Sequence, residues 1–228
     1  MPLFIKHAQP LWGVWKIDES ANELLTMLTR NDVRLLPDKI RAERRRQEWL
    51  AVRVLLKELI GEETLIAYHT DGAPYLPEKN LHISISHTNG YAAVIVSEQF
   101  AAGIDIEHLN DRIHRVRKRF MHPKEDSMID TEHETEHLLV CWCAKETLIK
   151  LIRHDGTDLR EHLRLSPFKY EGSGYFTAFE TRTPRRASYS LYYIVNKYFA
   201  MTCCLDMMVV IRPSLLNSMI MVLLFLMT

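Results

Sequence analysis

Two acidic side chains stand two positions apart in the stretch Gly-Ile-Asp-Ile-Glu at residues 103–107. Successive side chains of an extended strand point to opposite faces, so Asp105 and Glu107 would share one face and the isoleucines the other. The two carboxylates would then lie roughly 7 Å apart. Oxygen ligands of this kind suit Mg²⁺, so the acidic face could hold that ion. An ordinary strand with a solvated acidic face is the alternative.

A second pair of charged residues lies on a helix predicted over residues 137–154. Glu146 and Lys150 are four positions apart and are therefore neighbours on one helix face. An exposed helical ion pair is one interpretation. The pair borders an apolar stripe, however, so Glu146 could complete a metal site begun upstream, and Lys150 could offer a positive charge to a phosphate.

Residues 81–86 alternate strictly between apolar and polar types, which predicts a half-buried strand. His87 opens the turn that follows, and Asn-Gly at residues 89–90 is a strong hairpin signal. Return strands over residues 91–96 and 100–107 would bring His87 near the two carboxylates. Upstream, a helix predicted from about residue 37 to Gly61 carries arginines along its first two turns, as either a solvated or a phosphate-binding face.

The remaining elements are taken from the same periodicities. The predicted strands cover residues 11–17, 168–170, 175–180, 189–195 and 200–208, and the shorter helices follow Ser20 and Asn110. The order of helices and strands predicts an α+β protein of two similar halves, each an antiparallel sheet packed with a long helix. We place the halves at residues 1–108 and 109–228.

Composition limits the class of protein. The chain has 228 residues, 29 basic and 29 acidic, so its net charge favours no nucleic-acid or membrane partner. The four cysteines have the spacing of neither a disulfide scaffold nor a zinc ribbon, which predicts buried thiols in a cytoplasmic protein. Residues 215–228 are strongly apolar but shorter than the ~20 residues of a membrane-spanning helix, so a terminal core element is expected.

Several of these stretches together carry a family resemblance. Residues 103–107, Phe120 with Glu125, and Trp-Cys-Ala-Lys-Glu-Thr-Leu-Ile-Lys at residues 142–150 resemble the signature of the 4′-phosphopantetheinyl transferases. Ile-Ser-Ile-Ser-His-Thr at residues 83–88 is similar to an upstream motif of that family. The resemblance covers about residues 37–155, and the length is similar to that of the surfactin-type members, which are monomers of two similar halves.

The resemblance implies a reaction and a set of roles. Coenzyme A would donate its 4′-phosphopantetheine arm to a serine of an acyl or peptidyl carrier protein, with release of adenosine 3′,5′-bisphosphate. Asp105, Glu107 and Glu146 match the family's Mg²⁺ ligands, and Lys150 matches the lysine that contacts a phosphate. The base is open between Glu146, directly or through water, and Glu125.

The resemblance also implies how coenzyme A is held. Ser86 and His87 match the position that binds the 3′-phosphate, and one or more of Arg41, Arg45 and Arg53 would assist. Ala73 stands where many relatives have a phosphate-binding lysine, so one contact is missing or comes from elsewhere. The basic helix at residues 112–119 would suit an acidic carrier protein, although a solvated helix is an equal alternative.

Two other functions have some support in the sequence. His133-Glu134-Thr-Glu-His137 has the form of the zinc-protease motif, but the surrounding run has no apolar face against which such a helix would pack. A non-catalytic module that binds coenzyme A or a carrier protein is the other alternative. The presence of two candidate metal ligands on one strand, with Glu146 and Lys150 downstream, favours the transferase.

Overall fold

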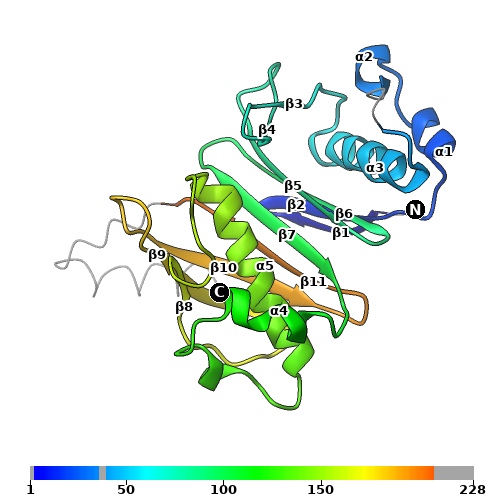
Figure 1. The fold of residues 1–228 in the computed structure, drawn as a ribbon. Coiled ribbons are helices and arrows are strands. Elements are labelled where there is room, and N and C mark those ends of the chain that lie inside the picture. The colour runs from blue at the N-terminus through cyan, green and yellow to red at the C-terminus, as the bar shows by residue number, and fades with distance from the viewer. Residues whose placement is uncertain (1–2, 36–39, 208–228) are drawn as a thin grey trace, which may run out of the picture.

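The computed structural model describes residues 3–35 and 40–207. These residues form two large antiparallel sheets, each covered by one long helix, and a small two-stranded sheet (Figure 1). The α+β class and the two-half organisation predicted from the sequence are confirmed. The tail after residue 207, including the apolar stretch at residues 215–228, lies outside the described residues.

The first half contains a four-stranded sheet in the order β1-β2-β6-β5. Its strands are β1 (Leu3–Ala8), β2 (Leu11–Lys16), β5 (His82–Thr88) and β6 (Tyr91–Ser97). Helix α3 (Glu43–Ile60) covers one face, where Leu50, Leu55 and Leu59 pack on Val94 and Val96. The strands flanking the Asn-Gly turn are confirmed, whereas β1 was not predicted.

Short elements complete this half: α1 (Ala21–Thr26), α2 (Asn31–Arg34), β3 (Ala67–Tyr68) and β4 (Pro74–Tyr75). Ser20 caps α1 as predicted, through a capping box with Glu23. Gly61 ends α3 with a left-handed φ of 83°, also as predicted. The predicted start of α3 near residue 37 is wrong, because Ala42 has an extended backbone and the helix begins at Glu43.

The second half contains a five-stranded sheet in the order β7-β11-β10-β9-β8. Its strands are β7 (Ala102–His108), β8 (Leu163–Leu165), β9 (Ser173–Glu180), β10 (Ser188–Val195) and β11 (Phe199–Leu205). Its helices are α4 (Ile113–Phe120), the 3-10 turn η1 (Asp126–Met128) and the long α5 (Glu134–Ile152). The predicted strand at residues 168–170 is wrong, because Phe168 and Tyr170 instead pack their rings around His137.

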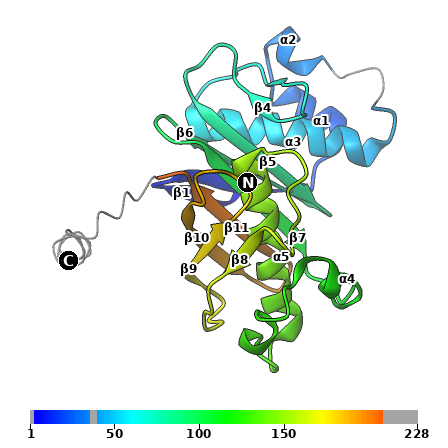
Figure 2. The same ribbon diagram turned by 60° about the vertical axis from the view of Figure 1, so that its left-hand side comes forward.

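The two sheets meet through an apolar layer, in which Trp12, Tyr91 and Ile95 face Ile104 and Met201. Figure 2 shows the halves one above the other, with β7 at their junction. By hydrogen bonding β7 belongs to the second sheet, since its Glu107 pairs with Ala200 of β11. It also packs on β5, and the division of the chain at residue 108 stays a prediction.

Gly103 lets β7 lie directly against α5. A Cβ atom at this position would lie 2.5 Å from the backbone oxygen of Thr147, so any larger residue would push the strand from the helix. The Thr147 hydroxyl lies 2.6 Å from that of Thr202 on β11, which fixes the helix to the same sheet. Asp105, two residues along β7, is thereby held beside the helix that carries Glu146 and Lys150.

Two further expectations can be compared with the structure. All four cysteines are buried and unpaired, as predicted from their spacing. None of the helices within residues 3–35 and 40–207 has the length and apolar character needed to cross a bilayer.

Candidate active site

The candidate site begins at an ion pair between α5 and β7. Lys150 Nζ donates to Asp105 Oδ1 at 2.8 Å and to the backbone oxygens of Ile104 and Ile85, at 2.9 and 3.2 Å. Ser86 Oγ, on β5, donates to the same Asp105 oxygen at 2.8 Å. Strand alternation turns Ser86 toward β7, and the Gly103 contact sets the distance to α5. One carboxylate oxygen therefore ties together three elements from both halves.

The second oxygen of Asp105 is exceptional. Oδ2 is buried and has no hydrogen-bond partner. Burial raises the pKa of Glu107 and of Glu146, and the negative charge of Asp105 raises the pKa of both further. Glu107 accepts one bond, from Trp142 Nε1 at 3.2 Å. The site thus gathers three half-buried or buried carboxylates that repel one another, and one oxygen of Asp105 among them has no partner.

This donor set fits a hard divalent cation. Carboxylate oxygens are what Mg²⁺ prefers, and an ion would satisfy Oδ2 and remove the repulsion that raises the two glutamate pKa values. Among the described residues no three His, Cys, Asp or Glu side chains stand ready-made as a metal site. The Lys150 ammonium occupies Asp105 Oδ1 instead, so holding an ion there would require this side chain to move.

A cavity of about 720 Å³ opens beside Lys150, between α3 and β5. Its volume is in the range of small-molecule and cofactor sites. All six residues predicted to bind coenzyme A line this cavity, namely Arg41, Arg45, Arg53, Ser86, His87 and Lys150. The side chains come from three separated segments, which the sequence could group only through the family resemblance.

Arg53 is a buried cation in the cavity wall. It is 5% exposed, its Nη1 donates to the Trp49 backbone oxygen at 3.0 Å, and its guanidinium lies 3.1 Å from the centre of the Trp49 ring. Burial lowers its pKa to about 10, so it stays charged at neutral pH. Within residues 3–35 and 40–207 no carboxylate pairs with it. A buried charge without a counter-ion attracts an anion from solvent.

His87 lies on the other face of β5 from Ser86, so it faces the cavity and α3 and not the acidic pair. Its Nδ1 is 3.5 Å from Oε2 of Glu48. Burial lowers the pKa of His87, and Arg45 and Lys150 act in the same direction, against the Glu48 carboxylate. We expected His87 to lie near Asp105 and Glu107, but in the structure its neighbour Ser86 contacts Asp105, and His87 contacts Glu48.

Two models of known protein families match most of the chain. A model of the 4′-phosphopantetheinyl transferase superfamily matches residues 101–204, and one of the 4′-phosphopantetheinyl transferase N-terminal domain matches residues 38–97. The chain belongs to the 4′-phosphopantetheinyl transferase superfamily. The N-terminal match holds the arginine helix and Ser86-His87, and the other match holds all the carboxylates of the site.

Three curated proteins are similar to parts of the chain. The 4′-phosphopantetheinyl transferase AcpT of Escherichia coli K12 is 29% identical over 112 residues, which are 46% of this chain and 57% of that protein. A 4′-phosphopantetheinyl transferase of Bacillus subtilis is 32% identical over 83 residues, 35% and 37% of the two chains. A putative 4′-phosphopantetheinyl transferase of Haemophilus influenzae is 29% identical over 139 residues, 54% and 58%. The matches thus span between about a third and somewhat over half of these relatives.

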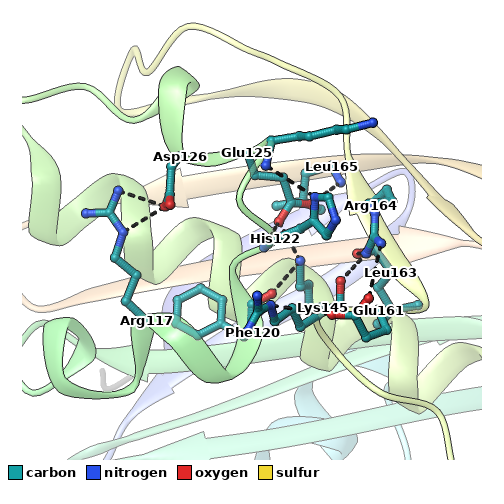
Figure 3. Close-up of polar contacts among 12 residues, drawn as sticks. Arg117, Phe120, His122, Glu125, Asp126, Lys145, Glu161, Leu163, Arg164 and Leu165 are labelled. Atoms are coloured by element: carbon teal, nitrogen blue, oxygen red, sulfur yellow. Dashed lines mark hydrogen bonds and ion pairs between the residues drawn. The ribbon is translucent and has the colours of Figure 1, made fainter.

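Glu125 lies apart from the site in this member of the superfamily. Its Oε2 accepts from Lys145 Nζ and from the His122 backbone N–H, both at 2.7 Å (Figure 3). Its Oε1 accepts from the Leu165 N–H at 2.8 Å. Glu125 is 3% exposed and Lys145 is fully buried. Because both oxygens of Glu125 are bonded within the chain, the structure favours Glu146 over Glu125 as the candidate base.

The zinc-protease motif does not form a common site. His133 lies at the N-terminal cap of α5, and Glu134 pairs with Arg117 at 2.6 Å. His137 is fully buried, and its Nδ1 accepts from the Asp130 backbone N–H at 3.1 Å. Nδ1 of each histidine is directed to Asp130, and His137 Nε2 is buried without a hydrogen-bond partner, so the structure does not bring the residues of the motif to one site.

The Gly72-Ala73-Pro74 turn forms the rim between the cavity and a second one of about 450 Å³. Asp71 Oδ1 accepts from the Ala73 N–H at 3.0 Å, and Arg153 bonds Asp71 Oδ2 at 2.7 Å. Arg153 thus ties the end of α5 to this turn.

Residues of the cavity wall that the sequence did not single out include Glu48, Trp49 and Tyr68. Glu48 had a usable signal, because it stands three and four positions after Arg45 and Arg44.

Proposed function

We propose that this chain transfers the 4′-phosphopantetheine arm of coenzyme A to a serine of an acyl or peptidyl carrier protein, with release of adenosine 3′,5′-bisphosphate. One observation carries the proposal. A cation-lined cavity of nucleotide size includes Ser86 and Lys150 in its wall, and both side chains bond Asp105, which has a buried oxygen without a partner and lies close enough to Glu107 and Glu146 to raise their pKa values. A pyrophosphate donor bound with a divalent cation needs both features in this order.

Positively charged side chains of the cavity would bind the phosphate groups of coenzyme A. Arg41, Arg45 and Arg53 supply guanidinium groups, which suit phosphate through paired N–H donors. His87 would join them at the 3′-phosphate. Ser86 shares this end of the cavity, although its hydroxyl proton is directed to Asp105. The pyrophosphate would then extend past Lys150 toward the acidic cluster.

Asp105, Glu107 and Glu146 would hold Mg²⁺, which supplies charge neutralisation at the pyrophosphate. Lys150 would exchange Asp105 for a phosphate oxygen, a short movement for a side chain that is 29% exposed. Glu146, acting directly or through a water, is the favoured base, because it belongs to the acidic cluster, whereas both oxygens of Glu125 are bonded within the chain. The serine proton would pass to Glu146 as the serine oxygen bonds to phosphorus and the bond to the departing bisphosphate breaks.

The carrier protein would approach from α4. The exposed side chains Arg112, Arg115, Lys118 and Arg119 form no ion pair within the described residues, whereas Arg117 is bonded to Asp126 and Glu134. Phe120 packs edge-on against Trp142, which also bonds Glu107. A carrier with an acidic helix could thus dock on α4 through complementary charge, close to the acidic cluster.

Mass spectrometry of an apo carrier protein tests the proposal. With coenzyme A and Mg²⁺, the carrier should gain the mass of one phosphopantetheine, and chelation of the metal should abolish the gain. Glu146→Gln should lose the activity, whereas Glu136→Gln, on the same helix but away from the cluster, should keep it. Coenzyme A binding without mass gain on acyl and peptidyl carriers would favour the binding module. An activity that requires zinc and is lost in His133→Ala would instead favour the zinc-protease alternative.

A further inference from the structure

A buried glutamate lies in the wall of the coenzyme A cavity. Glu48, on α3, is 3% exposed. Its Oε1 accepts from Arg44 Nε at 2.9 Å, its Oε2 accepts from Arg45 Nη1 at 3.1 Å, and the same Oε2 lies 3.5 Å from His87 Nδ1. It is thus the point at which α3 and β5 meet through polar side chains.

A carboxylate in this position is unexpected in a pocket for anions. Burial of an ionised group is unfavourable unless partners compensate, and Glu48 would by itself repel a phosphate. The partners explain its presence. Arg45 is a long side chain, 65% exposed, and His87 is 38% exposed, so neither is fixed by packing. Their common contact is Glu48, whose own side chain is held by burial.

The charges of the cavity remain positive after Glu48 is counted. Arg41, Arg53 and Lys150 line the same wall, and Arg44 also compensates Glu48 from outside the lining. A dianionic terminal phosphate would match this surplus better than a singly charged phosphate diester. The guanidinium group of Arg45 and the imidazole ring of His87 would bind phosphate well only when their orientations are fixed.

We propose that Glu48 is a positioning residue, which holds Arg45 and His87 toward the terminal phosphomonoester of the bound nucleotide. The inference rests on the proposed function, because it takes coenzyme A as the ligand. Glu48 does not touch the phosphate itself. Its contribution is to remove the freedom of two side chains before the ligand arrives, and this contribution should depend on whether the ligand has a 3′-phosphate.

Steady-state kinetics with two donors test this role. In Glu48→Gln, KM for coenzyme A should rise about tenfold, equal to about 1.4 kcal/mol, with kcat within about twofold. KM for dephospho-coenzyme A, which lacks the 3′-phosphate, should stay unchanged. Glu58→Gln, at an exposed position of the same helix, is the matched control and should alter neither constant. Equal changes for both donors, or none for either, would overturn the proposal.

Binding measurements separate this inference from the proposed function. Calorimetry with adenosine 3′,5′-bisphosphate and adenosine 5′-monophosphate needs no carrier protein. Glu48→Gln should weaken binding of the bisphosphate but not of the monophosphate. When Glu48→Gln is added to His87→Ala, the further loss of bisphosphate affinity should be smaller than the loss that Glu48→Gln causes in the unchanged chain. Binding of coenzyme A without transfer would overturn the proposed function only, whereas absence of binding to the unchanged chain would overturn both. A thermal melt of each variant excludes loss of fold as the cause.

Discussion

Lys145 and Lys150 stand five residues apart on α5, each paired with a carboxylate from another element, yet their surroundings are opposite. Lys145 is fully buried, and its partner Glu125 is bonded on both oxygens (Figure 3). Lys150 is 29% exposed at the edge of the cavity, and its partner Asp105 keeps one buried oxygen without a bond. The first pair is complete as it stands, and the second lacks a component.

The difference shows how a structural ion pair can be told from a functional one when both lie in one motif. In the complete pair every polar atom has a partner within the chain, so nothing is left for a ligand. In the incomplete pair, neighbouring carboxylates repel one another, and Lys150 spans β5 and β7 through two carbonyl bonds. Unfinished bonding at a cavity, more than the lysine itself, indicates the site.

Breaking the complete pair should have the largest effect. In Lys145→Met the buried Glu125 carboxylate loses its counter-charge, which should lower the free energy of unfolding by about 3–5 kcal/mol. Urea unfolding followed by circular dichroism measures the change. Glu125→Gln added to Lys145→Met should restore part of the loss, because the buried charge is then removed. A single variant as stable as the unchanged chain would contradict a structural role for this ion pair.

Breaking the incomplete pair should instead affect activity. Lys150→Ala should lower kcat/KM for transfer about 100-fold, or about 2.7 kcal/mol, because a phosphate loses its cation. The free energy of unfolding should fall less than in Lys145→Met, because Ser86 still bonds Asp105 and the Lys150 side chain is 29% exposed. The measurement is the carrier-protein assay beside urea unfolding of the same preparation. A loss of stability as large as that of Lys145→Met would remove the distinction between the two pairs.

Gly103→Ala should perturb the contact on which the site depends. The added methyl group would meet the Thr147 backbone oxygen, and overpacking of this kind costs about 1–3 kcal/mol. Because β7 would shift from α5, activity should fall as well, whereas the Lys145–Glu125 network should stay intact. Thermal unfolding with the transfer assay tests this. Gly172→Ala is not a suitable control, because φ at Gly172 is 76°, where an alanine would be strained in any case. Ala92→Gly, at a buried strand position, instead tests whether any exchange between alanine and glycine in a strand lowers stability and activity.

The smallest effect is expected at a third pair, near the surface. Lys57 and the backbone N–H groups of Thr29 and Arg30 bond Glu63, and its pKa is lowered to about 2 although burial opposes this. A lowered carboxyl pKa stabilises the fold above the unfolded value of about 4.5. This contribution should fade as the pH falls from there toward 2. The free energy of unfolding of Glu63→Gln should lie below that of the unchanged chain at pH 7, and this difference should shrink as the pH falls to 3. For the exposed control Glu62→Gln, the difference from the unchanged chain should not shrink between pH 7 and pH 3.

The sequence by itself determined most of the elements and the candidate residues. Strands β5, β6 and β7 follow from alternation and from the Asn-Gly turn, and α5 follows from its apolar stripe, because these signals are local. The carboxylate spacing on β7 and the motif around Glu146 and Lys150 indicated the superfamily. Local patterns missed β1 and β8, and placed the start of α3 too early.

Only the tertiary structure decided which charged residues belong to the site. The sequence left Glu125 as a second candidate for the base behind Glu146, and the structure encloses Glu125 between Lys145 and Leu165, which is forty positions away in the chain. Glu48 gained a role only when His87 of β5 was brought to α3. The physical reason is that burial, missing partners and charge repulsion depend on residues far apart in sequence, and no local pattern records which of them will meet.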